Sequence, residues 1–223
     1  WTGPGITSGV IFNPGTGAGI YEVVYTVGNG TCLTRDTLAI TVNPLPVLTI
    51  SPDTSICLND SAQLTASGGV SYSWSPSVGL SDTSVSNPMA SPAVTTTYTV
   101  LVTDSNGCAN TEVVTVTVNP LPDVEAGNDI TLCNQPIAEV LAGYSPLTGP
   151  SGVGVWSGQG VDPLGVFTPN GVDTITLTYT FTDNNTCTSS DSLVVTVIDP
   201  ELADAGLDFD TCIDVGLIDL TSL

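Results

Sequence analysis

The stretch YTVLVTDSNGC at residues 98–108, followed by TEVVTVTVNP at residues 111–120, decides the fold. Both runs are rich in Val and Thr, as β-strands are, and Pro ends the second run. The first stretch ends with Asp104, Asn106 and Gly107, which is the composition of a tight hairpin turn. The two runs therefore predict an antiparallel hairpin that closes a β domain.

The same hairpin recurs along the chain. The closing strand returns as DTLAITVNP at residues 36–44 and as DSLVVTVIDP at residues 191–200, and YTFTDNNTC at residues 179–187 precedes the latter. Further candidate strands, which bring each unit to six or seven, are SAQLTASG at residues 61–68, VSYSWSP at residues 70–76 and AEVLAGY at residues 138–144. No stretch has helical periodicity over ten residues. The pattern predicts an all-β chain of tandem immunoglobulin-like β-sandwiches.

Linker motifs divide the array. NPLP at residues 43–46 and 119–122 bounds one complete domain, residues 46–122, and a second occupies residues 123–199. Residues 1–45 match the C-terminal part of such a domain, because aligning Trp1 with Trp156 also aligns Cys32 with Cys187. Residues 200–223 match the N-terminal part of a further domain, since DAGLDFDTC at 204–212 repeats EAGNDITLC at 125–133. Because Pro restricts φ in the linkers, we expect a stiff rod cut from a longer chain.

The composition excludes several classes of protein. One basic residue against 22 acidic ones gives a net charge of −21, so the chain lacks the basic patches that bind nucleic acid. With 41% hydrophobic and only 10% charged residues, it has enough apolar surface to pack domains. No apolar run is long enough for a membrane span. We expect a soluble, secreted, acidic β-protein.

The six cysteines predict one disulfide in each domain. Cys57 and Cys108 are 51 positions apart, Cys133 and Cys187 are 54 apart, and Cys32 and Cys212 are their counterparts in the partial domains. A bond closing a loop of that length contributes about 4 kcal/mol in the chain-entropy model. A metal site is disfavoured, because the chain has neither CxxC nor His. The expected compartment is therefore oxidising and extracellular.

An aspartate precedes most of these cysteines by four positions. The set is Asp53, Asp104, Asp129, Asp183 and Asp208. If the predicted disulfides form, Asp53 lies near Asp104 and Asp129 near Asp183, and such pairs are candidate Ca²⁺ ligands. The alternative is that each aspartate caps its own turn through a hydrogen bond to the backbone. Calcium is the only cofactor that the sequence suggests.

The three tryptophans, Trp1, Trp74 and Trp156, hold one position of the repeat. We expect them to fill the domain cores rather than to stack on sugars. The chain has no His and no nucleophile motif, so the usual parts of acid–base or nucleophilic catalysis are missing. We therefore expect that it is not an enzyme.

The segment SAQLTASGGVSYSWSPSVGLSD at residues 61–82, with the hairpin that follows, resembles the Ig-like and PKD-like tandem repeats of giant surface proteins of Bacteroidetes. GVWSGQGV at 154–161 and LTYTFTDNNTC at 177–187 resemble the repeat type that alternates with them. The resemblance implies type IX export, a place at the cell surface in adhesins or gliding-motility filaments, and no catalytic residues. The leading hypothesis is thus a structural segment that gives reach, stiffness and surface attachment.

Two other hypotheses remain open. The domains could be glycan- or ligand-binding modules of a secreted enzyme. Alternatively, the chain could be a small subunit that polymerises head to tail, with the last residues of one copy completing the first 45 residues of the next by strand donation. That variant predicts a bond between Cys212 and Cys32 of the neighbour. The expected partners are accordingly neighbouring repeats or identical subunits, besides surface ligands that the sequence does not specify.

Overall fold

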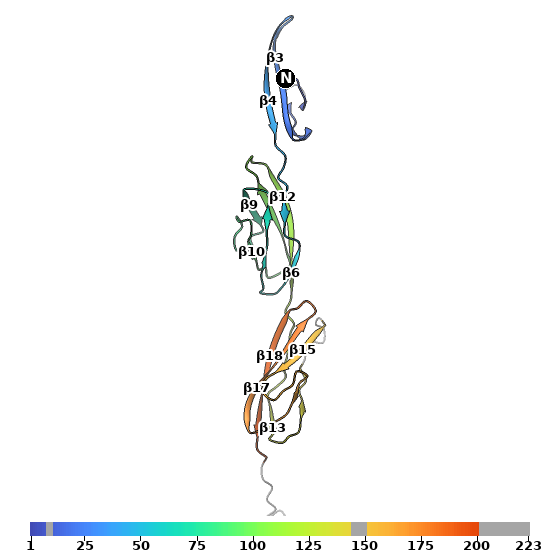
Figure 1. Ribbon diagram of the computed structural model, residues 1–223, viewed down its shortest axis with the longest axis vertical. Coiled ribbons are helices and arrows are strands. Elements are labelled where there is room, and N and C mark those ends of the chain that lie inside the picture. The colour runs from blue at the N-terminus through green and yellow to red at the C-terminus, as the bar shows by residue number, and fades with distance from the viewer. Residues whose placement is uncertain (8–10, 144–150, 201–223) are drawn as a thin grey trace, which may run out of the picture. The chain divides into compact units, whose positions relative to one another are not determined.

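The computed structural model describes residues 1–7, 11–143 and 151–200. Two compact units divide the chain, Trp1–Pro120 and Leu121–Leu223. Apart from one 3-10 turn, the regular elements in the described ranges are strands, which confirms the predicted all-β class (Figure 1). No helix in these ranges has the length and apolar character needed to cross a membrane.

Residues 46–120 form a complete domain around a four-stranded sheet in the order β6–β12–β11–β9. Its strands are β6 (Thr54–Cys57), β9 (Ser71–Ser75), β11 (Thr96–Thr103) and β12 (Ala109–Asn119). β11 pairs antiparallel with both β9 and β12, whereas β6 pairs parallel with β12. This order is that of the C, F and G strands of an immunoglobulin-like sandwich, with the first long strand added at the edge beside G.

A second, smaller layer closes this domain. It consists of two pairs, β5 (Thr49–Ile50) with β8 (Ala66–Ser67) and β7 (Ala62–Gln63) with β10 (Met89–Ala90). Buried and less buried side chains alternate along β11, as expected of a strand with one face in the core. The core between the layers contains Leu64, Trp74, Tyr98, Val100, Val102, Val114 and Val116.

Residues 121–200 repeat this architecture. The main sheet has the order β13–β18–β17–β15, and β13 again pairs parallel with the last strand. The elements are β13 (Ile130–Cys133), β14 (Glu139–Val140), β15 (Gly152–Ser157), β16 (Val166–Phe167), β17 (Asp173–Asp183) and β18 (Thr188–Ile198). Trp156, Phe167, Leu177, Tyr179 and Val195 belong to its core. The predicted tandem immunoglobulin-like sandwiches are confirmed, while their end residues stay a prediction.

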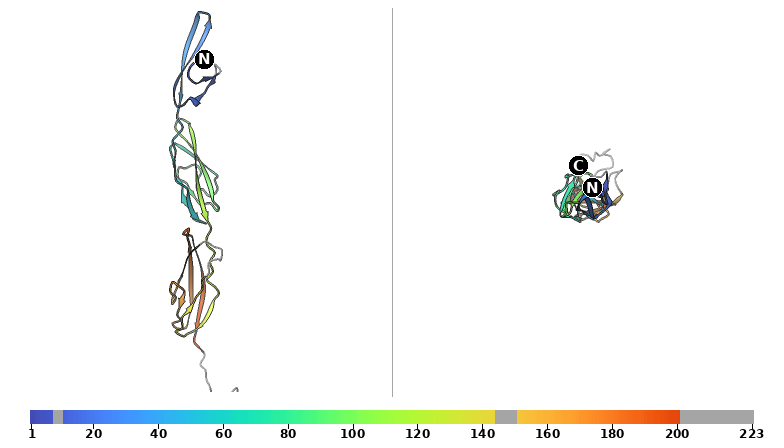
Figure 2. Two further views of the ribbon diagram at one scale, coloured as in Figure 1. Left: turned by 90° about the vertical axis from the view of Figure 1, so that its right-hand side faces the viewer. Right: turned by 90° about the horizontal axis from the view of Figure 1, so that it is seen from above.

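Residues 1–45 form only part of such a domain. A long hairpin joins β3 (Gly19–Asn29) and β4 (Cys32–Val42), and before it come β1 (Ile6–Thr7), β2 (Ile11–Phe12) and the 3-10 turn η1 (Pro14–Thr16). The N-terminal segment lies beside the half of the hairpin away from its turn (Figure 2). Among the described residues, β4 pairs with β3 alone, so its other edge lacks the parallel strand that β12 and β18 have.

Candidate functional site

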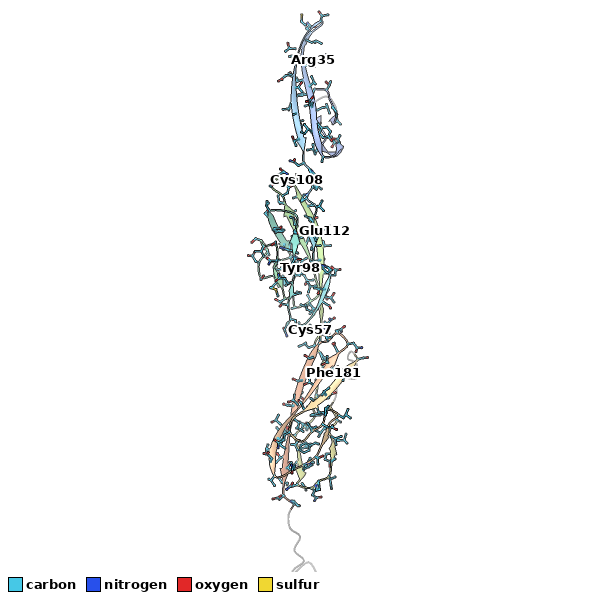
Figure 3. All side chains as sticks on the ribbon, in the orientation of Figure 1. Arg35, Cys57, Tyr98, Cys108, Glu112 and Phe181 are labelled. Carbon is cyan, nitrogen blue, oxygen red and sulfur yellow. The ribbon has the colours of Figure 1, made fainter. Side chains whose placement is uncertain are left out.

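The cysteines of the domain 46–120 lie at opposite ends of it (Figure 3). Cys57 pairs in register with Asn119, the last residue of β12, whereas Cys108 immediately precedes β12. A strand of that length separates its ends by roughly 35 Å, at about 3.3 Å per residue. A disulfide needs Cα atoms within about 7 Å. The predicted bond between Cys57 and Cys108 is therefore wrong, because the parallel register of β6 carries Cys57 to the far end.

The domain 121–200 corrects the second predicted pair for the same reason. Cys133 lies opposite Ile198 at the end of β18, and Cys187 precedes the start of that strand. Cys57 and Cys187 are each disulfide-bonded, whereas Cys32, Cys108 and Cys133 are free thiols. Cys212 lies outside the described residues. In each complete domain, the two cysteines thus lie at opposite ends and do not form the predicted bond with each other.

Two of the five candidate aspartates tie the first long strand to the last one. Asp53 Oδ1 accepts the backbone N–H of Thr115 at 2.8 Å, and Asp129 Oδ1 accepts that of Val194 at 2.8 Å. Each aspartate stands just before β6 or β13 and reaches the residue before the parallel pairing starts. These carboxylates extend the parallel ladder by one bond.

The other two described aspartates cap the hairpin turns. Asp104 Oδ1 accepts the backbone N–H groups of Asn106 and Cys108 at 2.8 and 2.9 Å. Asp183, which is buried, accepts those of Asn185 and Cys187 through Oδ1 at 2.8 Å each. This is the capping role that the sequence offered as the alternative to calcium.

The expected pairs of aspartates do not come together. Asp53 lies beside Thr115, well along β12 from the turn that holds Asp104, and Asp129 is displaced from Asp183 in the same way. Among the described residues, no group of three or more His, Cys, Asp or Glu side chains is placed to hold a metal ion. Asp208 lies outside them. The expected juxtapositions are therefore wrong, and Ca²⁺ binding stays a prediction.

A further carboxylate, which sequence reasoning missed, anchors the entry of the domain 121–200. Asp191 Oδ2 accepts the backbone N–H of Ala126 at 2.9 Å. This bond, with a second from the N–H of Ser192, lowers the pKa of the Asp191 carboxyl. Ala126 is fully buried, so the anchor holds the entering chain against the core.

The tryptophans occupy two different environments. Trp74 and Trp156 are only 3% and 4% exposed, and the indole N–H of Trp74 donates to the carbonyl of Val85 at 2.9 Å. Trp1 stacks on Tyr25 as Trp156 stacks on Tyr179, with ring centroids 5.1 and 5.2 Å apart, yet it is 41% exposed. The expected core position is thus found for two tryptophans and not for Trp1.

Trp1 belongs to an exposed apolar face on residues 1–45, which we call the open core face. It consists of Trp1, Tyr25, Val27 and Leu38, which are 41%, 43%, 54% and 50% exposed. The hairpin registers place Trp74, Val100, Val102 and Val114 at the same positions of the complete domain, where none is more than 3% exposed. This face could have been predicted from the repeat alignment. Aligning Trp1 with Trp156 shows that residues 1–45 do not include the strands that precede the tryptophan in a complete domain.

No family model matches the chain, and no curated protein does. Among solved structures, it is similar to the insect immune protein hemolin at 16% identity, covering 80% of this chain and 56% of that one, with a TM-score of 0.39. The chain thus spans little more than half the length of hemolin. A three-domain fragment of titin matches at 9% identity over 81% of this chain and 75% of that one, with a TM-score of 0.37.

The fibronectin(III)-like modules of CbhA from Clostridium thermocellum match at 13% identity over 73% of this chain and 100% of theirs, with a TM-score of 0.31. At these identities and scores, none of the similarities supports an argument about function. The strand order and register within each domain are what show the immunoglobulin-like fold.

Proposed function

We propose that this chain is a structural segment of a large extracellular surface protein, an adhesin or filament. Its domains provide reach and carry load between a cell and what the cell attaches to. The resemblance of the repeats to those of giant Bacteroidetes surface proteins supports this proposal. So does the disulfide-bonded state of Cys57 and Cys187, because such bonds persist in oxidising compartments.

The observation that carries the proposal is the parallel pairing of the first long strand with the last one in both complete domains. Thr54 to Cys57 pair with Val116 to Asn119, and Ile130 to Cys133 pair with Val195 to Ile198. Tension on the chain pulls the start of the first strand and the end of the last strand in opposite directions along one axis. All the bonds between them are then sheared together, which resists force better than breaking them one by one.

A glycan-binding role has less support. Stacking on sugars needs exposed aromatic rings, whereas in the two complete domains Trp74 and Trp156 lie within the cores. The carboxylates that sequence reasoning singled out in the described residues accept hydrogen bonds from the backbone. Their positions therefore suit stabilisation of strands and turns better than ligand binding.

The test is the location of the protein on intact cells. An antibody raised against the chain should label unpermeabilised cells in immunogold electron microscopy, at a distance from the outer surface. Brief protease treatment of intact cells should remove the label. Label found only after permeabilisation would overturn the proposal. Cells that lack the gene are the control for antibody specificity.

A further inference from the structure

The turn that joins β3 to β4 contains a candidate site of covalent modification, the pair Asn29–Gly30. We propose that the side chain of Asn29 deamidates there without an enzyme, through attack by the backbone nitrogen of Gly30. Hydrogen bonds protect the other Asn–Gly pairs of the chain from the same reaction. Such a modification goes beyond the proposed function and does not depend on it.

The reaction needs only water. The backbone nitrogen of the Gly bonds to the side-chain Cγ of the Asn, its proton passes to water or hydroxide, and the carboxamide nitrogen leaves as ammonia. Water then opens the cyclic succinimide at one carbonyl or the other, which gives Asp or isoaspartate. One water enters and one ammonia leaves, so no oxidant or cofactor takes part. Gly is the most reactive following residue because no Cβ hinders the attacking nitrogen.

The sequence contains Asn–Gly three times, at Asn29, Asn106 and Asn170. All three asparagines are exposed, so exposure does not distinguish them. The attack requires the peptide group between Asn and Gly to rotate until the Gly nitrogen faces the carboxamide carbon. A hydrogen bond donated by the Gly N–H opposes that rotation, and so do bonds that fix the neighbouring peptide groups. The three turns differ in these bonds.

Asp104 fixes the turn around Asn106. Its Oδ1 accepts the N–H groups of Asn106 and Cys108 at 2.8 and 2.9 Å, and its backbone carbonyl accepts the N–H of Gly107 at 3.1 Å. The nitrogen that would attack is therefore already a donor, and the peptide groups beside it are held as well. Deamidation of Asn106 requires these bonds to open first.

Asn134 has the corresponding role at Asn170. Its Oδ1 accepts the N–H of Gly171 at 3.0 Å, and its Nδ2 donates to Asp199 Oδ1 at 3.0 Å. The second bond fixes the carboxamide of Asn134, so that the N–H of Gly171 stays engaged. Asn170 is thus protected by a side chain that follows β13.

The turn at Asn29 is not capped in this way. Asn29 pairs with Cys32, which leaves only Gly30 and Thr31 between the closing residues. In the hairpins of the two complete domains, the closing residue at this place is an aspartate whose carboxylate caps a longer turn. Among the described residues, the carboxamide of Asn29 and the N–H of Gly30 have no hydrogen-bond partner. The lack of a cap is a property of this short turn, whatever strand lies beside β3.

The surroundings of Gly30 leave room for the reaction. Its φ is +61°, and a Cβ placed on it would meet no atom within 4 Å. Rotation of the peptide group between Asn29 and Gly30 breaks only the last pair of the ladder, Asn29–Cys32, since the next pair, Gly28–Leu33, lies beyond it. The end of a hairpin opens at a low free energy compared with its interior.

The products would change the turn. Isoaspartate carries the main chain through its side-chain carbons, so position 29 could no longer pair with Cys32 in the same register. Aspartate would add one negative charge to a chain whose net charge is already −21. Because the released ammonia is lost, the modified fraction increases with the age of the protein.

The experiment incubates the full-length chain at mildly alkaline pH, in native buffer and in urea, and follows each asparagine by mass spectrometry of chymotryptic peptides. An isoaspartate methyltransferase with a labelled methyl donor identifies the isoaspartate product. In native buffer, Asn29 should react at least about tenfold faster than Asn106 or Asn170, which is the factor that one net hydrogen bond contributes. In urea the three rates should become similar. Similar rates in native buffer, or an Asn29 that reacts only in urea, would overturn the proposal.

Two variants test the protection directly. Asp104→Ala removes the cap, so deamidation of Asn106 should become severalfold faster while Asn170 keeps its rate. Asn134→Ala frees the N–H of Gly171 and should accelerate Asn170 alone. Hydrogen exchange of the core strands checks that each variant is folded. Unchanged rates at both asparagines in the folded variants would contradict protection by these bonds.

Two further variants serve as controls. Asn29→Gln should abolish modification at this position, because a glutamine side chain would have to close a larger and slower-forming ring. Asp162→Ala removes another turn cap, whose Oδ1 accepts the N–H groups of Leu164 and Val166 at 3.0 and 2.8 Å, but no Asn–Gly pair lies in that turn. It should leave all three rates unchanged, and a general acceleration would show that loss of stability rather than local protection sets them.

Discussion

Replacing Trp74 by Ala tests the packing of the domain 46–120. The indole is 3% exposed, fills the core between the two layers and donates its N–H to the carbonyl of Val85 at 2.9 Å. Truncating a buried Trp to Ala costs about 3–5 kcal/mol. We expect the upper part of that range, because the partly buried carbonyl of Val85 also loses its donor.

The loss is large for a domain of this size. For residues 46–120, the typical free energy of unfolding per residue gives a total of about 4–11 kcal/mol. At roughly 4–8 °C per kcal/mol, the melting temperature should fall by at least ~15 °C. Trp74→Phe keeps an aromatic ring and loses only the indole bond, so we expect about 1–2 kcal/mol.

Hydrogen exchange followed by mass spectrometry on the full-length chain provides the assay. Peptides from β11 and β12 should exchange much faster in Trp74→Ala, whereas peptides from β17 and β18 serve as an internal control and should not change. Equal protection of β11 and β12 in the variant and the wild type would refute the assignment of Trp74 to the core.

Three further results are expected. Asp53→Ala should destabilise the domain 46–120 by about 1 kcal/mol in urea titration, because Thr115 loses its acceptor, and an unchanged midpoint would contradict this role. Because folding lowers the pKa of Asp191, its carboxylate stabilises the folded state above the pKa that it has in the unfolded chain, and this stabilisation is lost as the pH falls below about 4. Melting temperatures of Asp191→Asn measured against pH should lack this loss, and a variant with the wild-type pH dependence would refute the role of Asp191. Millimolar Ca²⁺ or a chelator should leave calorimetric melting temperatures unchanged, because backbone donors already satisfy the described candidate aspartates, and a rise with Ca²⁺ would favour the metal hypothesis.

The repeated hairpin made most of the fold predictable. Alternating Val and Thr runs, Asp–Asn–Gly turns and terminal Pro identify β11–β12 and β17–β18 from local sequence alone. The shorter strands were harder to predict from the sequence. SAQLTASG, predicted as one strand, contains the two separate strands β7 and β8, and of AEVLAGY only Glu139–Val140 forms a strand within the described residues. Their pairing depends on contacts across the core rather than on composition.

The cysteine pairing could not be predicted from spacing. Two cysteines about 50 residues apart suggest a closed loop, but the loop closes only if both lie at the same end of the domain. The parallel register of β6 on β12 places Cys57 opposite Asn119 instead. That register is a property of the tertiary fold. Cysteine spacing alone therefore could not predict which cysteines lie close together.

The exposed state of Trp1 has the same kind of origin. Its sequence context is that of Trp74 and Trp156, so local pattern predicts a core residue. Burial, however, depends on strands that come earlier in a complete domain, and the described residues 1–45 do not supply them. Trp1 is therefore 41% exposed and Trp74 only 3% exposed, although both hold the same position of the repeat.

Single-molecule stretching of the full-length chain between its two ends, with all cysteines reduced, tests the central claim of a load-bearing array most directly. The parallel terminal strands predict two separate unfolding events, each releasing about 25 nm of chain at roughly 3.4 Å per residue. Pulling instead through handles at the paired residues Thr97 and Thr115 peels β11 from β12 bond by bond, and should need distinctly less force. Extension without force peaks, or equal forces in the two pulling directions, would contradict the account.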